Sequence, residues 1–364
     1  TTALAVALGF GIAPPSYATE TSEKYELQDL FPIEEYGKGD SIVIPVKYND
    51  DKTSNFSFFS AANLKAMASQ YSSKNNVVKV KDQQQTGSCW AFSATTVLEH
   101  YRYKQSTSNT EVFSPKHIEY ATANKYSDGT ATNSELYSDC VFNRAVNSGG
   151  NAYASFAYFI AGEGPVLESD MPFTSPNEKI NASSLNVPKA DIEVEKYVIL
   201  PNIEKDHSTG SLVYKDSTGE TISSSEVNSI REQIKSAIYN YGSVTAMTYL
   251  DTTYFNEDMS AYFCNDSSVG VDHAITIIGW DDTYSASNFN PNNRPSQDGA
   301  YIVQNSHGTQ NYDEGYMYVS YEDVNIELNC YAIASLKEKS YDYIYQYDNL
   351  GVNRGVGAET SSTG

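Results

Sequence analysis

Apolar and polar positions along the middle of the chain follow two patterns, one helical and one extended. After Gly87-Ser88, apolar residues recur every three or four positions, which predicts a helix with one buried face. Val271-Asp-His-Ala-Ile-Thr-Ile-Ile-Gly279 is a continuous apolar run of strand length, and 301–320 consists of two apolar stretches separated by a polar turn. The sequence therefore predicts a helix after Ser88, a strand that opens at His273, and a strand–turn–strand unit. The helix-spaced apolar residues are Ala94, Val97, Leu98 and Tyr101.

The first 76 residues differ from this dense pattern. Residues 1–18 begin with an uncharged apolar run too short to cross a bilayer and end in small residues before Thr19, which predicts the remainder of a secretory signal peptide. A frayed apolar terminus is the alternative. Residues 19–76 are mostly polar and are interpreted as a leader or pro-segment, or as an ordinary N-terminal extension, with one short strand at 42–46.

The dense pattern continues over 77–338, which we interpret as one globular domain. Residues 339–364 start what looks like a new strand unit, and we expect them to open a downstream domain. No later stretch is long and apolar enough to span a membrane.

Charge and cysteine content exclude several classes of function. The 46 acidic and 24 basic residues give a formal charge of −22, which would repel nucleic acids and anionic membranes. Thirty tyrosines mainly indicate well-packed strands. The four cysteines form no Cys-x-x-Cys pair, so zinc and redox motifs have no support. Whether Cys264 and Cys330 pair with each other stays open at this point.

One cysteine, Cys89, has the surroundings of a nucleophile. Ser88 is a good N-cap, so Cys89 falls in the first helical turn, where the helix dipole and the N–H groups stabilise a thiolate. Gln83, six residues earlier, can present its side-chain amide beside the N–H of Cys89, and two such donors make an oxyanion hole. The alternative for a lone cysteine is a buried small hydrophobe.

A thiolate needs a histidine as its proton acceptor, and the chain has five. His100 lies eleven residues along the helix of the nucleophile (100 − 89), too far along its axis. His117 and His207 are expected at the surface. His273 opens the apolar strand and is the candidate base, with a satisfied histidine at a strand edge as the alternative; His307, also considered as the base, lacks the strand-opening position.

These segments resemble the papain-like cysteine peptidases. Gln83 and Gly87-Ser-Cys-Trp-Ala-Phe-Ser93 match the nucleophile motif of that family in order and spacing, and His273-Ala followed by hydrophobics and Gly-Trp matches its histidine motif. Asn305 matches the asparagine that orients the histidine, and Asn147-Ser-Gly-Gly-Asn151 resembles the glycine motif that lines the substrate groove.

The chain also departs from the family. His307 stands where the family has a tryptophan that shields the Asn–His hydrogen bond, and Gln85-Thr86 stands where it has a disulfide cysteine. The interval from Cys89 to His273 is 184 residues (273 − 89), longer than the ~130–150 typical of papain and the cathepsins. We attribute the difference to loops inserted near 125–131 and 207–211.

The resemblance implies an α+β, papain-like two-lobed fold, with a helical lobe, a β-barrel-like lobe and the active-site cleft between them. It implies peptide-bond hydrolysis through a thioester, with no metal or organic cofactor, by a secreted or cell-surface protein similar to those of Gram-positive bacteria that carry a lectin-like domain. The expected partners are a polypeptide substrate, its own leader, and cell wall or surface glycans bound by a downstream part. Two alternatives remain, a binding or adhesion protein with a decayed site and a transglutaminase-like acyltransferase. The expected site residues are Cys89, His273, Asn305 and Gln83 for catalysis, and Gly87, Ser88, Gly149, Gly150 and Asp272 for substrate binding.

Overall fold

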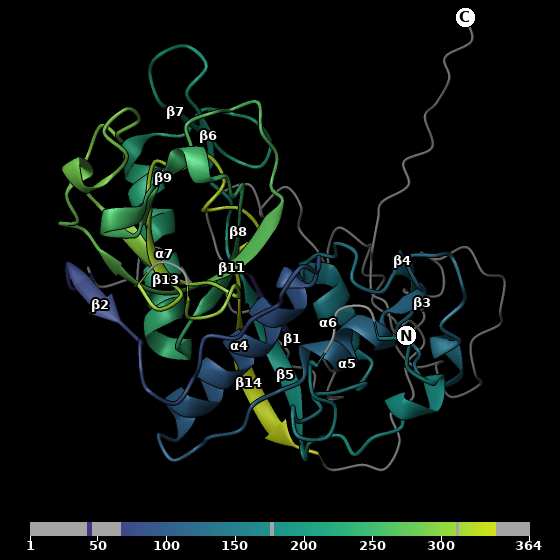
Figure 1. Ribbon diagram of the computed structural model, residues 1–364. Coiled ribbons are helices and arrows are strands. Elements are labelled where there is room, and N and C mark those ends of the chain that lie inside the picture. Colours follow the sequence, from purple (N-terminus) through teal and green to yellow (C-terminus); the bar gives the residue numbers. More distant parts are fainter. Residues whose placement is uncertain (1–41, 46–66, 175–177, 311–312, 340–364) are drawn as a thin grey trace, which may run out of the picture. The chain divides into compact units, whose positions relative to one another are not determined.

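The computed structural model describes residues 42–45, 67–174, 178–310 and 313–339 (Figure 1). The chain forms two compact units, each assembled from segments far apart in the sequence. Of the described residues, those within Thr1–Asp82, Thr96–Glu111 and Glu195–Leu336 form the sheet unit, and those within Gln83–Thr95, Val112–Val194 and Lys337–Gly364 form the helical unit. Helix α4 (Cys89–Gln105) gives its first residues to the helical unit and, from Thr96 onward, its later residues to the sheet unit.

The sheet unit is built on a sheet with ten strands in the described residues. Nine strands follow the order β1-β5-β14-β8-β11-β12-β13-β10-β9, and β2 pairs with β11 in addition. A separate hairpin joins β6 (Glu204–Asp206) and β7 (Val213–Lys215). The strands of the large sheet are β1 (Ile42–Pro45), β2 (Gln70–Ser72), β5 (Ile192–Ile199), β8 (Val244–Thr248), β9 (Phe255–Asn256), β10 (Ala261–Tyr262), β11 (His273–Asp281), β12 (Ala300–Gln304), β13 (Tyr316–Ser320) and β14 (Tyr331–Glu338).

Strand β11 lies inside this sheet, and its position explains its continuous apolar sequence. It pairs antiparallel with β8 from His273 to Ile277 and with β12 from Thr276 onward, and every residue before Asp281 is buried. A strand covered on both faces needs apolar residues at successive positions. Gly279 lies at a bulge where β2 approaches: a Cβ there would be 2.3 Å from the carbonyl oxygen of Tyr71.

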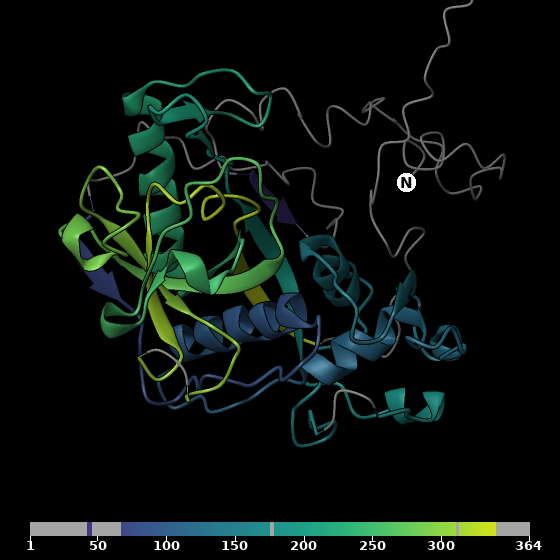
Figure 2. The same ribbon diagram turned by 45° about the horizontal axis from the view of Figure 1, so that its top comes forward.

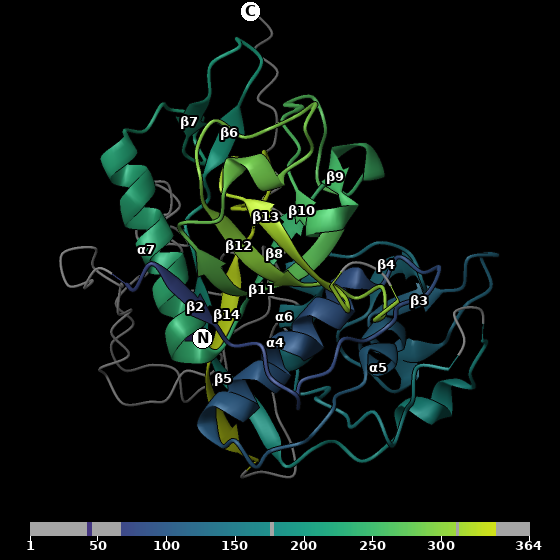
Figure 3. The ribbon, with the colours of Figure 1, turned by 60° about the vertical axis from the view of Figure 1, so that its left-hand side comes forward.

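Helix α7 (Ser224–Tyr241) packs against β8 and β11 and covers this part of the sheet (Figures 2 and 3). Its start is a capping box, in which Ser223 and Glu226 each accept a hydrogen bond from the backbone N–H of the other. Its end is Gly242, whose φ of 98° lies in the region that favours glycine. The buried face of α7 joins one apolar core with the sheet through Val227, Ile230, Ile234 and Ile238.

The helical unit contains α5 (Pro115–Ala121), α6 (Ala152–Ile160) and a parallel pair of short strands, β3 (Ala123–Lys125) and β4 (Phe142–Ala145). Local sequence sets both helix starts. The hydroxyl of Ser114 accepts the N–H of His117 at the start of α5, and the side chain of Asn151 accepts the N–H of Ala154 at the start of α6.

Most elements expected from the sequence are present. The helix begins at Cys89, the apolar strand at His273, and β12 and β13 form the strand–turn–strand unit. The short strand expected at 42–46 is β1, paired with β5. The expected signal peptide, most of the expected leader and nearly all of the downstream unit expected over 339–364 lie outside the described residues.

The expectation that His117 lies at the surface is wrong. Its ring is buried between Tyr158 and the carbonyl of Leu185, because α5 turns this face toward α6. His207 is half-buried, and its Nε2 lies 2.9 Å from the carbonyl oxygen of Glu322.

None of the four cysteines forms a disulfide, so Cys264 and Cys330 do not pair with each other. No helix within the described residues is long and apolar enough to cross a membrane. The described residues also bring together no group of three or more histidine, cysteine, aspartate or glutamate residues able to hold a metal ion.

Candidate active site

The residues before α4 hold Cys89 at the helix start. The carbonyl of Ser88 accepts the N–H groups of Ala91 and Phe92, so the helical hydrogen bonds begin there and Cys89 is the first helical residue. The hydroxyl of Ser88 is buried against that of Thr86. Cys89 is 8% exposed. The N–H groups of a first turn favour a negative charge at that position, which is the property a thiolate needs.

Gln83 is buried in the same loop. Its Nε2 donates to the carbonyl of Thr86 at 2.7 Å, and the hydroxyl of Thr86 donates back to the carbonyl of Gln83 at 2.6 Å. This reciprocal pair fixes the direction of the amide. A side-chain amide carries two N–H donors, and this bond uses one of them.

The glycine motif at 147–151 lies against the loop that precedes α4. The N–H of Gly87 donates to the carbonyl of Asn147 at 3.0 Å, and a Cβ on Gly87 would be 2.9 Å from the backbone of Gly149. A Cβ on Gly150 would be 2.3 Å from the indole of Trp90, the residue after Cys89. Gly149 is exposed, and nothing lies within 4 Å of its Cβ position.

A buried ion pair holds this glycine loop, and the sequence analysis did not identify it. Arg144 bonds Glu119 at 2.5 Å and the carbonyl of Ser148 at 3.1 Å, while Glu119 also accepts the N–H of Asn147. The guanidinium of Arg144 lies 4.8 Å from the centre of the Trp90 ring. Burial raises the pKa of Glu119, and Arg144 opposes this shift. The sequence did contain a sign of this ion pair, because Glu119 is the one charged residue in the apolar second half of α5.

His273 and Asn305 are brought together by neighbouring strands of the sheet unit. Nε2 of His273 lies 2.8 Å from Oδ1 of Asn305, and both residues are buried. The N–H of Ser306 donates to the same Oδ1 at 2.8 Å. Because a backbone N–H only donates, the atom facing it is the amide oxygen. Nε2 of His273 therefore carries the proton, and in the neutral ring Nδ1 has the lone pair of a base.

His307 lies over this pair. Its ring stacks on that of His273 with 4.7 Å between centroids and 19° between planes, and its Nδ1 lies 3.4 Å from Nδ2 of Asn305. Burial and the nearby His307 lower the pKa of His273 to about 4, and the bond to Asn305 partly opposes them. Burial also lowers the pKa of His307, while Asp82 acts in the opposite direction.

A second hydrogen-bond chain supports the turn that carries Asn305. His100 on α4 and Gln304, the residue before Asn305, form a buried hydrogen bond of 2.9 Å, and Gln304 donates to the carbonyl of Lys79. Burial lowers the pKa of His100 to about 4, although the bond to Gln304 acts against it. His100 therefore supports the end of strand β12 through its hydrogen bond to Gln304.

The predicted site residues form two groups. Gln83, Gly87, Ser88, Cys89, Gly149 and Gly150 belong to the helical unit, whereas Asp272, His273 and Asn305 belong to the sheet unit. Asp272 is exposed just before β11, and its Oδ1 accepts the N–H of Leu250 at 3.0 Å.

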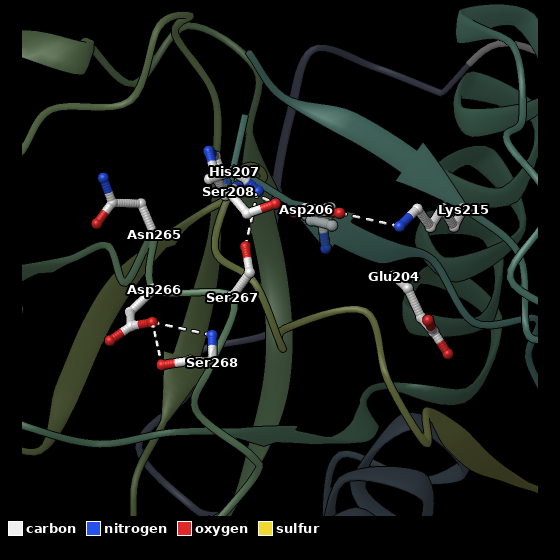
Figure 4. A pocket seen from close by; sticks show the side chains of 10 residues that line it. Glu204, Asp206, His207, Ser208, Lys215, Asn265, Asp266, Ser267 and Ser268 are labelled. Atoms are coloured by element: carbon white, nitrogen blue, oxygen red, sulfur yellow. Dashed lines mark hydrogen bonds and ion pairs between the residues drawn. The ribbon is translucent and has the colours of Figure 1, made fainter. Parts of the chain in front are cut away.

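A polar hollow of about 480 Å³ lies beside the β6–β7 hairpin, and none of the predicted site residues lines it (Figure 4). Lys215 pairs with Asp206 there, and the loop around Asp266 forms the other wall. Its side chains bond mainly to one another and to nearby backbone.

Comparison with known proteins identifies the class. The chain belongs to the papain family of cysteine proteases, because the model of that family matches residues 66–336. The α+β, papain-like fold predicted from the sequence is confirmed.

Among solved structures, the chain is similar to the cysteine protease and lectin-like domains of Cwp84, a surface layer associated protein of Clostridium difficile. Identity is 25%, the TM-score is 0.58, and the match covers 79% of this chain and 56% of that one. A structure of the clostridial cysteine protease Cwp84 after propeptide cleavage matches with 26% identity and a TM-score of 0.53, over 72% of this chain and 56% of that one. The chain thus spans little more than half the length of these structures. No curated protein gave a match.

Proposed function

We propose that this chain is a cysteine endopeptidase that cleaves peptide bonds with Cys89 as nucleophile, His273 as base and Asn305 as the residue that orients the base. The proposal includes the meeting of the Cys89 thiol with Nδ1 of His273, which the reaction requires. Membership of a cysteine protease family and the two groups of residues described above support it.

The single observation that carries the proposal is the polarity of the hydrogen bonds around Asn305. The N–H of Ser306 identifies Oδ1, Oδ1 accepts Nε2–H of His273, and the lone pair is thereby assigned to Nδ1. This is the tautomer that accepts a proton from a thiol. A histidine with a pKa of about 4 is neutral at pH 7, so its lone pair is available, and a thiolate beside it would raise that pKa.

The reaction then proceeds in two acyl transfers. The sulfur of Cys89 attacks the scissile carbonyl carbon after its proton passes to Nδ1 of His273, and the N–H of Cys89 and the second N–H of the Gln83 amide stabilise the oxyanion. His273 returns the proton to the amine as the C–N bond breaks, which leaves a thioester. Water attacks the thioester, gives a proton to His273, and releases the carboxylic acid and the thiol.

The open side of the glycine motif supports an extended peptide as the substrate. Gly149 offers backbone without a side chain, and the backbone N–H and C=O groups of such a segment pair with a substrate strand. Gly87, Ser88, Gly150 and Asp272 complete the proposed substrate-binding residues.

The test is covalent labelling of the intact protein with an epoxide inhibitor selective for papain-type thiolates, with Cys89→Ala as control. The other three thiols serve as internal controls, because burial raises the pKa of Cys140 and of Cys264 to about 12 and raises that of Cys330 further. We expect one adduct on the wild type and none on the variant, together with cleavage of a denatured protein substrate.

Two outcomes would contradict the proposal. No adduct on the wild type, even after limited proteolysis of residues before 67, would favour the binding-protein alternative. Labelling of Cys89 with amine transfer but no peptide cleavage would favour the acyltransferase.

We also propose a secreted or cell-surface location, a leader that interacts with the enzyme, and glycan binding by a downstream part. The support is the apolar run within residues 1–18 and the similarity to Cwp84, a surface layer associated protein. One structure of Cwp84 comprises its cysteine protease and lectin-like domains, and another was obtained after propeptide cleavage.

A further inference from the structure

His307 takes the place of a shielding aromatic residue, but its contacts give it additional chemistry. Its ring stacks on His273 at 4.7 Å, and its Nδ1 lies 3.4 Å from Nδ2 of Asn305. An indole in this position would cover the hydrogen bond without accepting one, because its nitrogen is only a donor.

The hydrogen-bond polarity determines the state of His307. Oδ1 of Asn305 is identified by the N–H of Ser306, so the other amide atom is Nδ2, which only donates. Nδ1 of His307 must then hold a lone pair. The ring in this arrangement is neutral and carries its proton on Nε2.

The charges around His307 come from two directions. From β11, His273 faces it directly, and from the segment before Gln83, Asp82 forms a backbone bridge with His307 and its carboxylate favours the protonated ring. Lys81 touches the same turn only through its carbonyl, which accepts the N–H of Gly308, while its ammonium pairs with Glu99 at 2.5 Å.

We propose that His307 is a positioning residue whose neutral ring holds the amide of Asn305 with Oδ1 toward His273, and whose protonation sets an acid limit on catalysis. When Nδ1 of His307 is protonated, it becomes a donor and faces Nδ2 of Asn305, which is also a donor. The hydrogen bond that positions the Asn305 amide is then lost. The same proton also places a positive charge against the ring of His273, which must itself become an imidazolium during the reaction. The proposal rests on the proposed function and adds a pH control to the same site.

The test compares two variants that separate the roles. His307→Asn places an amide oxygen near the position of Nδ1, so it keeps an acceptor and removes the titration. His307→Leu removes both. His207→Asn, at the half-buried histidine bonded to Glu322, is the control and should keep the wild-type profile.

The measurements are kcat and KM for a peptide substrate from pH 4 to pH 9. We expect both variants at 307 to shift the acid limb of kcat downward by about one pH unit, because the protonation of His307, which sets this limb in the wild type, can no longer occur. We expect His307→Leu alone to lose about tenfold in kcat at pH 7.5 with little change in KM, because Asn305 is no longer held. An unshifted acid limb in His307→Asn, or equal kcat in the two variants, would overturn the proposal.

A second measurement does not depend on activity. In ¹⁵N-histidine-labelled Cys89→Ala protein, the pKa of His273 should rise by about half a unit or more when His307 is replaced by Asn, because a neighbouring positive charge is removed. An unchanged His273 titration would overturn the proposal even in an active enzyme. If the wild type neither cleaves peptides nor reacts with the inhibitor while this shift is seen, the proposed function fails and the electrostatic coupling stands.

Discussion

Nε2 of His273 lies 2.8 Å from Oδ1 of Asn305, and the two residues come from adjacent antiparallel strands and the turn that follows them. The register of β11 and β12, which pairs Thr276 with Gln304, sets this distance. The bond orients the ring of His273 because the acceptor is itself oriented by the N–H of Ser306.

Removal of the acceptor should therefore reduce turnover more than binding. In Asn305→Ala, we expect kcat to fall by about 100-fold, since His273 loses its fixed ring orientation, with KM changed by less than about threefold. Steady-state kinetics measures this, and circular dichroism confirms that the variant folds. A kcat near that of the wild type would show that Asn305 does not orient the base.

The two glycines of the substrate motif should respond differently to alanine. A Cβ on Gly150 would lie 2.3 Å from Trp90, whereas that of Gly149 would meet nothing within 4 Å. We expect Gly150→Ala to lower the free energy of unfolding by about 1–3 kcal/mol through overpacking. Gly149→Ala should leave the stability unchanged and raise KM for peptides. Urea denaturation and kinetics measure the two effects, and equal stability losses would contradict this assignment.

Buried neutral histidines should make the protein sensitive to acid. The pKa values of His100 and His117 are lowered to about 4 by burial, against about 6.5 for an unfolded chain. Between pH 6.5 and pH 4 the unfolded state binds more protons, so the free energy of unfolding falls as the pH falls. Each histidine contributes about 1.4 kcal/mol per pH unit at most.

Urea denaturation at several pH values measures this slope. In His100→Gln, the overall stability should be lower because the bond to Gln304 changes, but the slope between pH 6.5 and pH 4 should be shallower. The same slope in both proteins would show that His100 is not a source of acid sensitivity.

Among the ion pairs of the sheet unit, one buried cluster should contribute most to the stability of the protein. Glu327 pairs with Lys205 at 2.8 Å and with Arg231 at 2.7 Å, and the glutamate is fully buried. Burial by itself would raise the pKa of Glu327, but Arg231 and Lys205 outweigh it and lower the pKa to about 2. Glu327→Gln leaves two buried cations without their anion, and we expect a loss of about 3–5 kcal/mol.

The matched control is Asp128→Asn, which breaks an exposed pair with Lys179. Water already solvates both groups there, so we expect no measurable change in the urea midpoint. Equal losses of stability in Glu327→Gln and Asp128→Asn would show that burial does not make the Glu327 cluster more important than an exposed pair.

The sequence by itself determined the elements that local chemistry controls. The helix start at Cys89 follows from Gly87-Ser88 and the apolar spacing after them, and the buried strand at His273 follows from an uninterrupted apolar run. The family motifs placed Asn305 beside His273, and the structure agrees.

Only the tertiary structure decided which polar residues are buried and what they contact. His117 and Glu119 lie one turn or less apart on α5 and both are buried, because α6 and the loop after β4 cover them. The stacking of His307 on His273 depends on strand register and on the turn at Asn305. Hydrophobic periodicity reports which face of an element is covered, whereas hydrogen-bond partners of buried polar groups are chosen by segments far away in the sequence, which no local pattern encodes.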